Sequence, residues 1–151
     1  MIRATIDTPT GPVTVEETGG AITRLTWGRG GGGGTSPLLT EAAAQLGAYF
    51  DRRLTVFDLP LAPAGGAFQQ AFLAILRDIP YGATRSYGEI ARQMGAPARA
   101  IGQACGANPI PILIPCHRVL GASGLGGFSG GVGVETKVAL LRLEGAAGLL
   151  I

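Results

Sequence analysis

Apolar and polar residues alternate along the first 27 residues, the period that is typical of half-buried strands. Turn signals at Pro9–Pro12 and at Gly19–Gly20 divide this stretch into three runs. We therefore predict a small antiparallel sheet at the start of the chain.

The next segments predict a loop, a helix and one more strand. The glycine tract at 28–34 would be a flexible loop, because consecutive glycines lose much backbone entropy when they are fixed. Thr40 can cap a helix over 41–51. Its inward side chains would be Leu46, Tyr49 and Phe50. Residues 54–59 are expected to form the further strand.

The spacing of apolar residues changes after residues 60–66, a stretch of prolines and glycines that is the best linker candidate in the chain. One helical stripe then runs over 68–79, and Pro80 ends it. We therefore expect two domains, at 1–63 and 67–151. The expected fold class is α+β, with a small N-terminal antiparallel sheet and helix followed by a mainly helical C-terminal domain.

Two short helices in the second half form a helix-turn-helix candidate. Ser86 and Glu89 make a capping box that predicts a helix over 87–94, and a glycine turn separates it from a second helix over 97–106. The outer face of that second helix carries only Arg99, Gly102, Gln103 and Gly106. Such a face is either plainly solvated or kept flat for close approach to another surface, with Arg99 as its only charge.

Composition indicates a folded protein, since 46% of the residues are hydrophobic and 15% are charged. The basic residues exceed the acidic ones in residues 79–151, and arginine supplies all of them except Lys137. This balance is compatible with nucleic acid, although genome composition could equally favour arginine. No uncharged apolar run is long enough to span a bilayer and no signal peptide is evident, so we expect a cytoplasmic protein without membrane contact.

The segment from Asn108 to Arg118 is the strongest candidate for chemistry. Its prolines exclude a helix and predict an extended chain, and its apolar residues predict burial. It delivers Cys116 next to His117, the only histidine of the protein. Neighbours in a strand point to opposite faces, whereas in a turn the imidazole could reach the thiol through a water.

Three other features of the sequence do not predict a functional site. Cys105 falls on the inner side of its helix and is interpreted as a small core residue. Two cysteines and one histidine without Cys-x-x-Cys spacing do not predict a metal site. The Gly-x-Ser-x-Gly motif at 127–131 lacks both a preceding strand and a later histidine, so we do not interpret it as a hydrolase nucleophile.

These motifs together resemble the methylated-DNA–protein-cysteine methyltransferases, which repair 6-O-alkylguanine. The resemblance spans about residues 67–145 and extends weakly to 1–60, which would form the RNase H-like N-terminal domain of that family. The residues that carry it are Arg99-Ala-Ile-Gly102, Asn108-Pro109, Ile114-Pro-Cys-His-Arg-Val119, Phe128-Ser-Gly-Gly131 and Leu143-Glu-Gly145.

The resemblance implies a suicidal reaction in which Cys116 is the irreversible acceptor of a methyl or larger alkyl group from 6-O-alkylguanine or 4-O-alkylthymine. His117 would act as a base through a water, and Glu144 would orient the imidazole. Tyr87 would donate a proton or hydrogen bond as the guanine leaves. Each molecule would act once, with no cofactor and no metal.

The resemblance also implies a partner, double-stranded DNA bearing an alkylated guanine, which a monomer would bind. Arg99 would enter the duplex and fill the gap left by the flipped nucleotide. Further DNA contacts would come from Ser86, Ala100 and Gln103. The substrate pocket would be formed by Asn108, Val119, Ser129 and Gly130, and Asn108 would also hold the turn that presents Cys116.

The chain departs from the family pattern in two places. Phe128 stands where the family usually has tyrosine, and Lys137 lies nine residues after it rather than about seven. Two other functions remain open, a non-catalytic binder that senses lesions and a cysteine or serine hydrolase.

Overall fold

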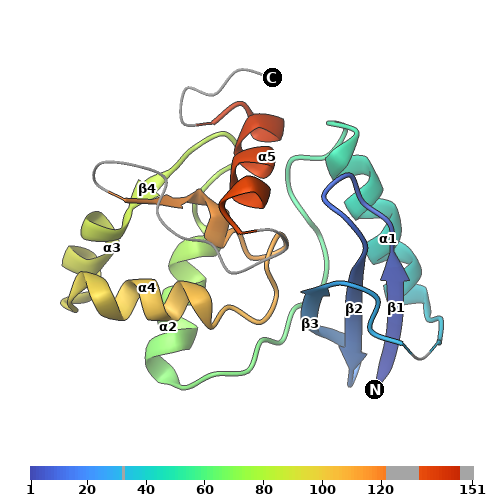
Figure 1. Cartoon of the computed structure of the whole chain (residues 1–151). Helices are drawn as coiled ribbons and strands as arrows, with labels where there is room; N and C mark the ends of the chain where they lie inside the picture. Colours follow the sequence, from blue (N-terminus) through green and yellow to red (C-terminus); the bar gives the residue numbers. More distant parts are fainter. Residues whose placement is uncertain (32, 122–132, 147–151) are drawn as a thin grey trace.

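The N-terminal part is a three-stranded antiparallel sheet (Figure 1). The computed structural model describes residues 1–31, 33–121 and 133–146. The strands are β1 (Ile2–Ile6), β2 (Val13–Thr18) and β3 (Ala21–Trp27), in that order across the sheet. Val15 at the centre pairs with Ala4 on one side and with Leu25 on the other. The predicted sheet is confirmed.

Helix α1 (Pro37–Phe50) packs against this sheet through one face, which carries Leu39, Ala42, Leu46 and Tyr49. The prediction that Thr40 caps the helix is wrong. Ser36 is the N-cap, and its hydroxyl accepts a hydrogen bond of 3.0 Å from the Leu39 amide. Pro37 explains the earlier start, because its fixed φ and missing amide hydrogen suit the first helical position.

The strand predicted at 54–59 is wrong, because these residues form turns and irregular chain. Val56 is 72% exposed, so the alternation of apolar residues does not correspond to a buried face here. The chain reaches the sheet only afterwards, where Leu61 makes a parallel bridge to Ile22. A strand needs a neighbouring edge to pair with, and β3 offers its edge to residues 60–62 instead.

The glycine tract after β3 is a loop, as predicted, and two of its residues, Gly28 and Gly30, are hydrogen-bonded to the sheet. The buried Thr14 hydroxyl donates to the Gly28 carbonyl at 2.8 Å and accepts from the Gly30 amide at 2.7 Å. A Cβ on Gly30 would lie only 2.8 Å from Cγ2 of Thr14. Glycine at this position therefore permits a close approach to β2.

The second half is mainly helical, which confirms the predicted fold class. Its elements are α2 (Ala67–Arg77), β4 (Arg85–Ser86), α3 (Tyr87–Met94), α4 (Ala98–Gly106), the 3₁₀ turn η1 (Cys116–Arg118), β5 (Val119–Leu120) and α5 (Val134–Glu144). The capping box of Ser86 and Glu89 is present, and Gly95 ends α3 with a φ of 64°. Helices α3 and α4 pack together as the predicted helix-turn-helix.

The short parallel pair β4–β5 connects the start of this helix-turn-helix to the end of η1. Ser86 pairs with Leu120, so Tyr87 at the first turn of α3 lies beside the chain that leaves Cys116. This contact brings two segments that are about thirty residues apart in sequence to one place.

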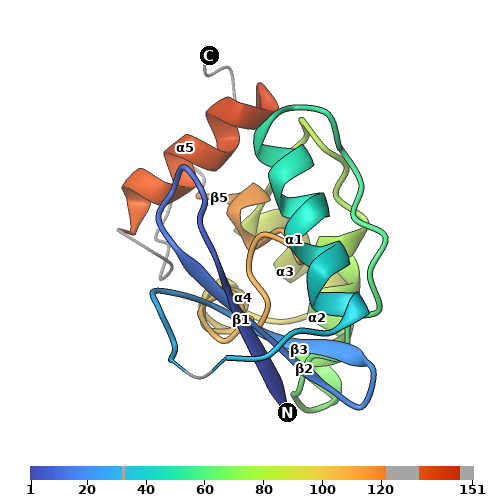
Figure 2. The same ribbon diagram turned by 90° about the vertical axis from the view of Figure 1, so that its right-hand side faces the viewer.

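One hydrophobic core joins the two halves and includes buried residues of the sheet, α1, α2 and the segment before Cys116. The Leu25 amide of β3 also donates to the Pro109 carbonyl at 2.9 Å. The C-terminal ends of α1 and α5 lie side by side, as the view in Figure 2 also shows. Within the described residues, no helix is long and apolar enough to cross a membrane.

Candidate active site

Asn108 organises the segment that leads to Cys116. Its side-chain oxygen accepts from the Ile110 amide at 3.0 Å, and its side-chain nitrogen donates to the Ile114 carbonyl at 2.9 Å. The Ile114 amide donates in turn to the Ile110 carbonyl at 2.9 Å. One amide side chain therefore closes a six-residue loop at both ends.

The extended conformation predicted for this segment is wrong, although its burial is confirmed. The chain turns between Pro109 and Ile114, and Ile112 adopts a φ of 71° while only 1% exposed. Proline fixes its own φ near a value that turns also use, so it excludes a helix without requiring a strand. A left-handed φ is costly for a β-branched residue, and the surrounding packing and the Asn108 bridge hold it in place.

Cys116 opens the 3₁₀ turn η1, and the next two residues are His117 and Arg118. Pro115 precedes the turn, and the Cys116 amide donates to the Ile114 carbonyl at 2.8 Å. Of the two arrangements left open by the sequence, the turn is the one present. The thiol and imidazole therefore do not alternate across a strand.

The Cys116 side chain is buried, and burial raises the pKa of its thiol. A hydrogen bond with Asn108 and the charge of Lys137 act in the opposite direction without overcoming this effect. The thiol is therefore protonated at neutral pH, and a base is needed to form the thiolate.

His117 is completely buried, and its Nε2 lies 2.8 Å from Oε2 of Glu144. Burial lowers the pKa of His117 by more than Glu144 raises it, so the ring is neutral at neutral pH. Since the carboxylate accepts, Nε2 must carry the hydrogen and Nδ1 the lone pair. This Nδ1 atom is buried and has no hydrogen-bond partner within the described part of the chain.

Glu144 is the centre of a buried cluster of donors. Arg118 donates from Nε to Oε1 at 2.8 Å and from Nη2 to Oε2 at 3.0 Å, while Tyr49 donates to Oε2 at 2.5 Å. Burial by itself would raise the pKa of Glu144, but the hydrogen bonds of His117 and Arg118, together with the charge of Arg118, lower it to about 2. The carboxylate is therefore ionised throughout the neutral range.

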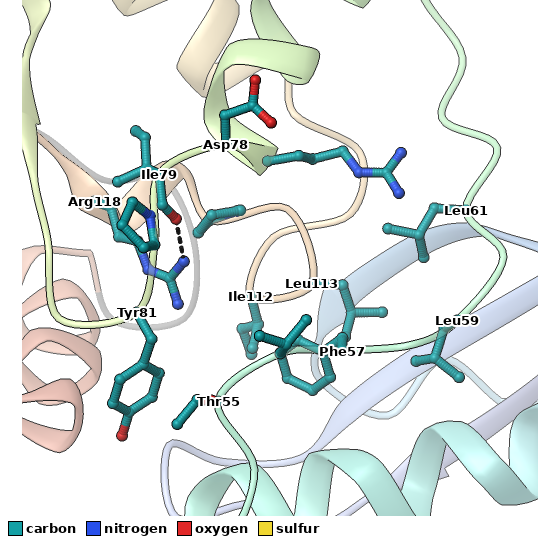
Figure 3. A pocket seen from close by; sticks show the side chains of 14 residues that line it. Thr55, Phe57, Leu59, Leu61, Asp78, Ile79, Tyr81, Ile112, Leu113 and Arg118 are labelled. Atoms are coloured by element: carbon teal, nitrogen blue, oxygen red, sulfur yellow. Dashed lines mark hydrogen bonds between the residues drawn. The ribbon is translucent and has the colours of Figure 1, made fainter.

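Arg118 is held from a second direction as well. Its Nη1 donates to the Ile79 carbonyl at 2.6 Å, and its guanidinium lies 5.9 Å from the centre of the Tyr81 ring. Figure 3 shows this arrangement beside a cavity of about 370 Å³ between the segment around Phe57 and the chain after α2. Arg118 thus anchors the carboxylate to the rest of the fold.

A second cluster lies near Cys116 and contains Tyr87, Cys105, Lys137 and Val119. The Lys137 ammonium donates to the Val119 carbonyl at 2.6 Å and lies 5.7 Å from the centre of the Tyr87 ring. Burial and the neighbouring Cys105 raise the pKa of Tyr87 to about 12, so its hydroxyl keeps its proton at neutral pH. Cys105 is only partly buried, and its thiol hydrogen-bonds the Tyr87 hydroxyl.

The outer face of α4 is exposed as the sequence predicted. Arg99, Gly102, Gln103 and Gly106 are all exposed, whereas Ile101 and Ala104 are buried. A Cβ on Gly102 or Gly106 would meet nothing within 4 Å. Packing within the chain therefore does not require glycine at either position.

Sequence reasoning missed the contacts of Tyr49 and Arg118 with Glu144. The signal available for Tyr49 was its inward position, because a buried tyrosine hydroxyl needs a hydrogen-bond partner. Ser129 and Gly130, the Gly-x-Ser-x-Gly motif and Phe128 lie outside the described residues. Within the described residues, no three His, Cys, Asp or Glu side chains gather as a metal site requires.

Two family models match this chain. The one described as "6-O-methylguanine DNA methyltransferase, DNA binding domain" matches residues 67–146. The one described as "6-O-methylguanine DNA methyltransferase, ribonuclease-like domain" matches residues 1–63.

Curated relatives carry a related name. A methylated-DNA–protein-cysteine methyltransferase of Mycobacterium tuberculosis is 47% identical over 155 residues, which cover 93% of this chain and 90% of that protein. One of Methanosarcina acetivorans is 50% identical over 109 residues, which cover 70% of this chain and 69% of that protein.

Solved structures agree with the fold. Mycobacterium tuberculosis OGT in complex with DNA has a TM-score of 0.86 and 48% identity, covering 96% of this chain and 93% of that chain. An O6-methylguanine DNA methyltransferase from Methanococcus jannaschii has a TM-score of 0.69 and 27% identity, covering 98% and 96%. On these matches to both halves, the chain belongs to the 6-O-methylguanine DNA methyltransferase family.

Proposed function

We propose that Cys116 removes the alkyl group from the 6-oxygen of guanine in DNA, or from the 4-oxygen of thymine, and keeps it. Alkyl transfer from DNA to a protein cysteine is the activity of the family. The observation that carries the assignment to this residue is the buried His117 beside it, with Nε2 on an ionised carboxylate and Nδ1 unoccupied by any described residue.

The proposed reaction is a direct displacement at carbon. The Cys116 sulfur attacks the alkyl carbon, a carbon–sulfur bond forms and the bond from carbon to the guanine oxygen breaks. His117 Nδ1 takes the thiol proton through a bridging water, and Glu144 stabilises the imidazolium that results. Tyr87, whose hydroxyl keeps its proton at neutral pH, donates toward the leaving guanine.

The product is an alkylated Cys116, a thioether, and this explains why each molecule would act once and need no cofactor. The sulfur is both the nucleophile and the final acceptor, and a thioether is not cleaved by water under these conditions. Each event therefore consumes one chain. A hydrolase would instead release its product and return to the free thiol.

Access to a buried thiol requires the alkylated nucleotide to leave the base stack, at a cost of a few kcal/mol. We assign entry into the duplex to the exposed face of α4, with Arg99 in the gap left by the flipped nucleotide. The open space over Gly102 and Gly106 supports a close approach of DNA to this helix. Ser86, Ala100 and Gln103 would contribute further contacts.

We further propose that Asn108 and Val119 line the pocket for the base, together with Ser129 and Gly130. Two observations support this assignment. The Asn108 side chain closes the loop that leads to Cys116, and Val119 follows the turn η1 and accepts a hydrogen bond from Lys137. We also propose that the chain acts as a monomer and in the cytoplasm.

Intact mass measurement after incubation with a duplex containing 6-O-methylguanine tests this proposal. We expect a gain of one methyl group per chain in the wild type and in Cys105→Ala, and no gain in Cys116→Ser. Cys105→Ala is the matched control, because it removes the other thiol of the chain. No gain on a folded wild-type chain contradicts the proposal and favours a non-catalytic binder.

A further inference from the structure

Tyr49 is a buried residue of α1 whose hydroxyl reaches the other half of the chain. Its side chain is 1% exposed and packs against the rings of Phe50, Phe57 and Tyr81, with centroid distances of 5.1, 5.2 and 6.2 Å. Its hydroxyl donates to Oε2 of Glu144, which is 95 positions later in the sequence. The ring alone would satisfy the packing, so the hydroxyl needs a separate explanation.

Tyr49 and His117 donate hydrogen bonds to the same oxygen atom of Glu144. Oε2 of Glu144 accepts from Nε2 of His117 at 2.8 Å and from the Tyr49 hydroxyl at 2.5 Å. Arg118 supplies the remaining donors, to Oε1 at 2.8 Å and to Oε2 at 3.0 Å. Donors from two separate elements, α1 and η1, therefore fix the plane of the carboxylate against the imidazole.

We propose that Tyr49 is a positioning residue for alkyl transfer: its hydroxyl holds the Glu144 carboxylate in the orientation that fixes the His117 ring. It would act through Glu144 without touching the substrate. By this route the N-terminal half of the chain contributes to a reaction whose other proposed residues all lie in the C-terminal half. The inference rests on the proposed function of Cys116 and His117.

Tyr81 restrains the backbone at the end of α5, which is a different role from orienting the Glu144 carboxylate. Its hydroxyl donates to the Leu143 carbonyl at 3.1 Å, and Arg52 donates to the same carbonyl at 3.4 Å. These contacts restrain the backbone one residue before Glu144, whereas Tyr49 contacts the carboxylate itself. Tyr81→Phe is therefore the matched control for Tyr49→Phe, since each removes one hydroxyl from the same region.

Removing the Tyr49 hydroxyl has a defined electrostatic consequence. The ionisable groups that face His117 and Glu144 are Arg118 in η1, Lys137 in α5, Tyr49 in α1 and Tyr81 after α2. Without the Tyr49 donor, Oε2 keeps more negative charge and stabilises the imidazolium. The pKa of His117 should therefore rise, and the carboxylate should lose part of its orientation.

The test uses untagged wild-type chain, Tyr49→Phe and Tyr81→Phe. His117 is the only histidine, so its ring nitrogen signals in an NMR titration belong to one residue. The same samples give the single-turnover rate of benzyl transfer from free 6-O-benzylguanine as a function of pH.

For Tyr49→Phe we expect the His117 titration to move to higher pH, the acid side of the rate profile to follow it, and the maximal rate to fall about tenfold. Tyr81→Phe should leave both the titration and the profile in place. Unchanged titration and rate in Tyr49→Phe, with normal uptake by the wild type, would overturn this inference alone. Absence of uptake by the wild type would instead overturn the proposed function, and this inference with it.

Discussion

His117 and Glu144 form a fully buried hydrogen bond of 2.8 Å between Nε2 and Oε2, although 27 positions separate them in the sequence. The carboxylate is kept ionised by Arg118, and the imidazole is kept neutral by burial. At Nδ1 the imidazole therefore has a lone pair without a partner among the described residues, on the residue that follows the protonated Cys116.

The buried Glu144 carboxylate should make the free energy of unfolding decrease at low pH. The pKa of Glu144 falls from 4.5 to about 2 on folding, because its hydrogen bonds to His117 and Arg118 outweigh the effect of burial. Its contribution to stability is therefore complete above pH 4.5 and is lost as the pH falls toward about 2. Urea unfolding at several pH values should show this slope in the wild type and a smaller one in Glu144→Gln. Equal slopes would contradict the assigned role of the charge.

Lys137 should assist the thiolate of Cys116. Its charge lowers the thiol pKa against the larger effect of burial, so Lys137→Met should raise that pKa further. In a Cys105→Ala background, we expect the pH midpoint for iodoacetamide labelling of Cys116 to move upward. Arg142→Met is the control, because Arg142 is exposed on the same helix. A midpoint that stays in place in Lys137→Met would show that its charge does not reach the sulfur.

Arg99 should matter for duplex DNA and not for the chemistry. It is an exposed charge on the outer face of α4, whereas His117 and Glu144 are buried. Arg99→Ala should therefore slow repair of a duplex by more than tenfold and leave benzyl transfer from the free base within about twofold. Gln69, which donates to the Ala104 carbonyl on the inner side of α4, offers a control in Gln69→Ala. Equal losses on both substrates in Arg99→Ala would refute the proposed entry into the duplex.

Gly102 should separate stability from DNA binding. Since a Cβ there would meet nothing within 4 Å, Gly102→Ala should stabilise the chain by about 1 kcal/mol through helix propensity. Gly102→Leu should also fold but should bind duplex DNA at least tenfold more weakly, because a large side chain blocks the close approach. Thermal unfolding and fluorescence anisotropy measure the two effects. Normal duplex binding by Gly102→Leu would place the DNA elsewhere.

Local signals predicted the helix-turn-helix well. The capping box of Ser86 and Glu89 and the left-handed Gly95 depend only on residues near them, so the sequence contains the whole explanation. The end of α5 at Gly145 has the same origin. Ser36 capped α1 in place of Thr40 because two suitable residues lay close together and Pro37 decided between them.

Local sequence patterns could not predict contacts between residues that are distant in the sequence. The turn before Cys116 depends on the Asn108 side chain reaching Ile114, which proline content alone does not specify. Glu144 by itself would be interpreted as a surface charge, but the packing of α5 against η1 and the contact with Tyr49 leave it only 5% exposed. Tyr49 was expected to point inward, but its partner depends on how α1 and α5 meet.

The central claim is that one sulfur, that of Cys116, receives one alkyl group and is then spent. The most direct measurement supplies a large excess of duplex containing radiolabelled 6-O-methylguanine and follows both the repaired guanine and the labelled peptide. We predict one guanine restored per chain, with all of the label on the peptide that contains Cys116. Repeated restoration by one chain, or label on a different residue, would contradict the account.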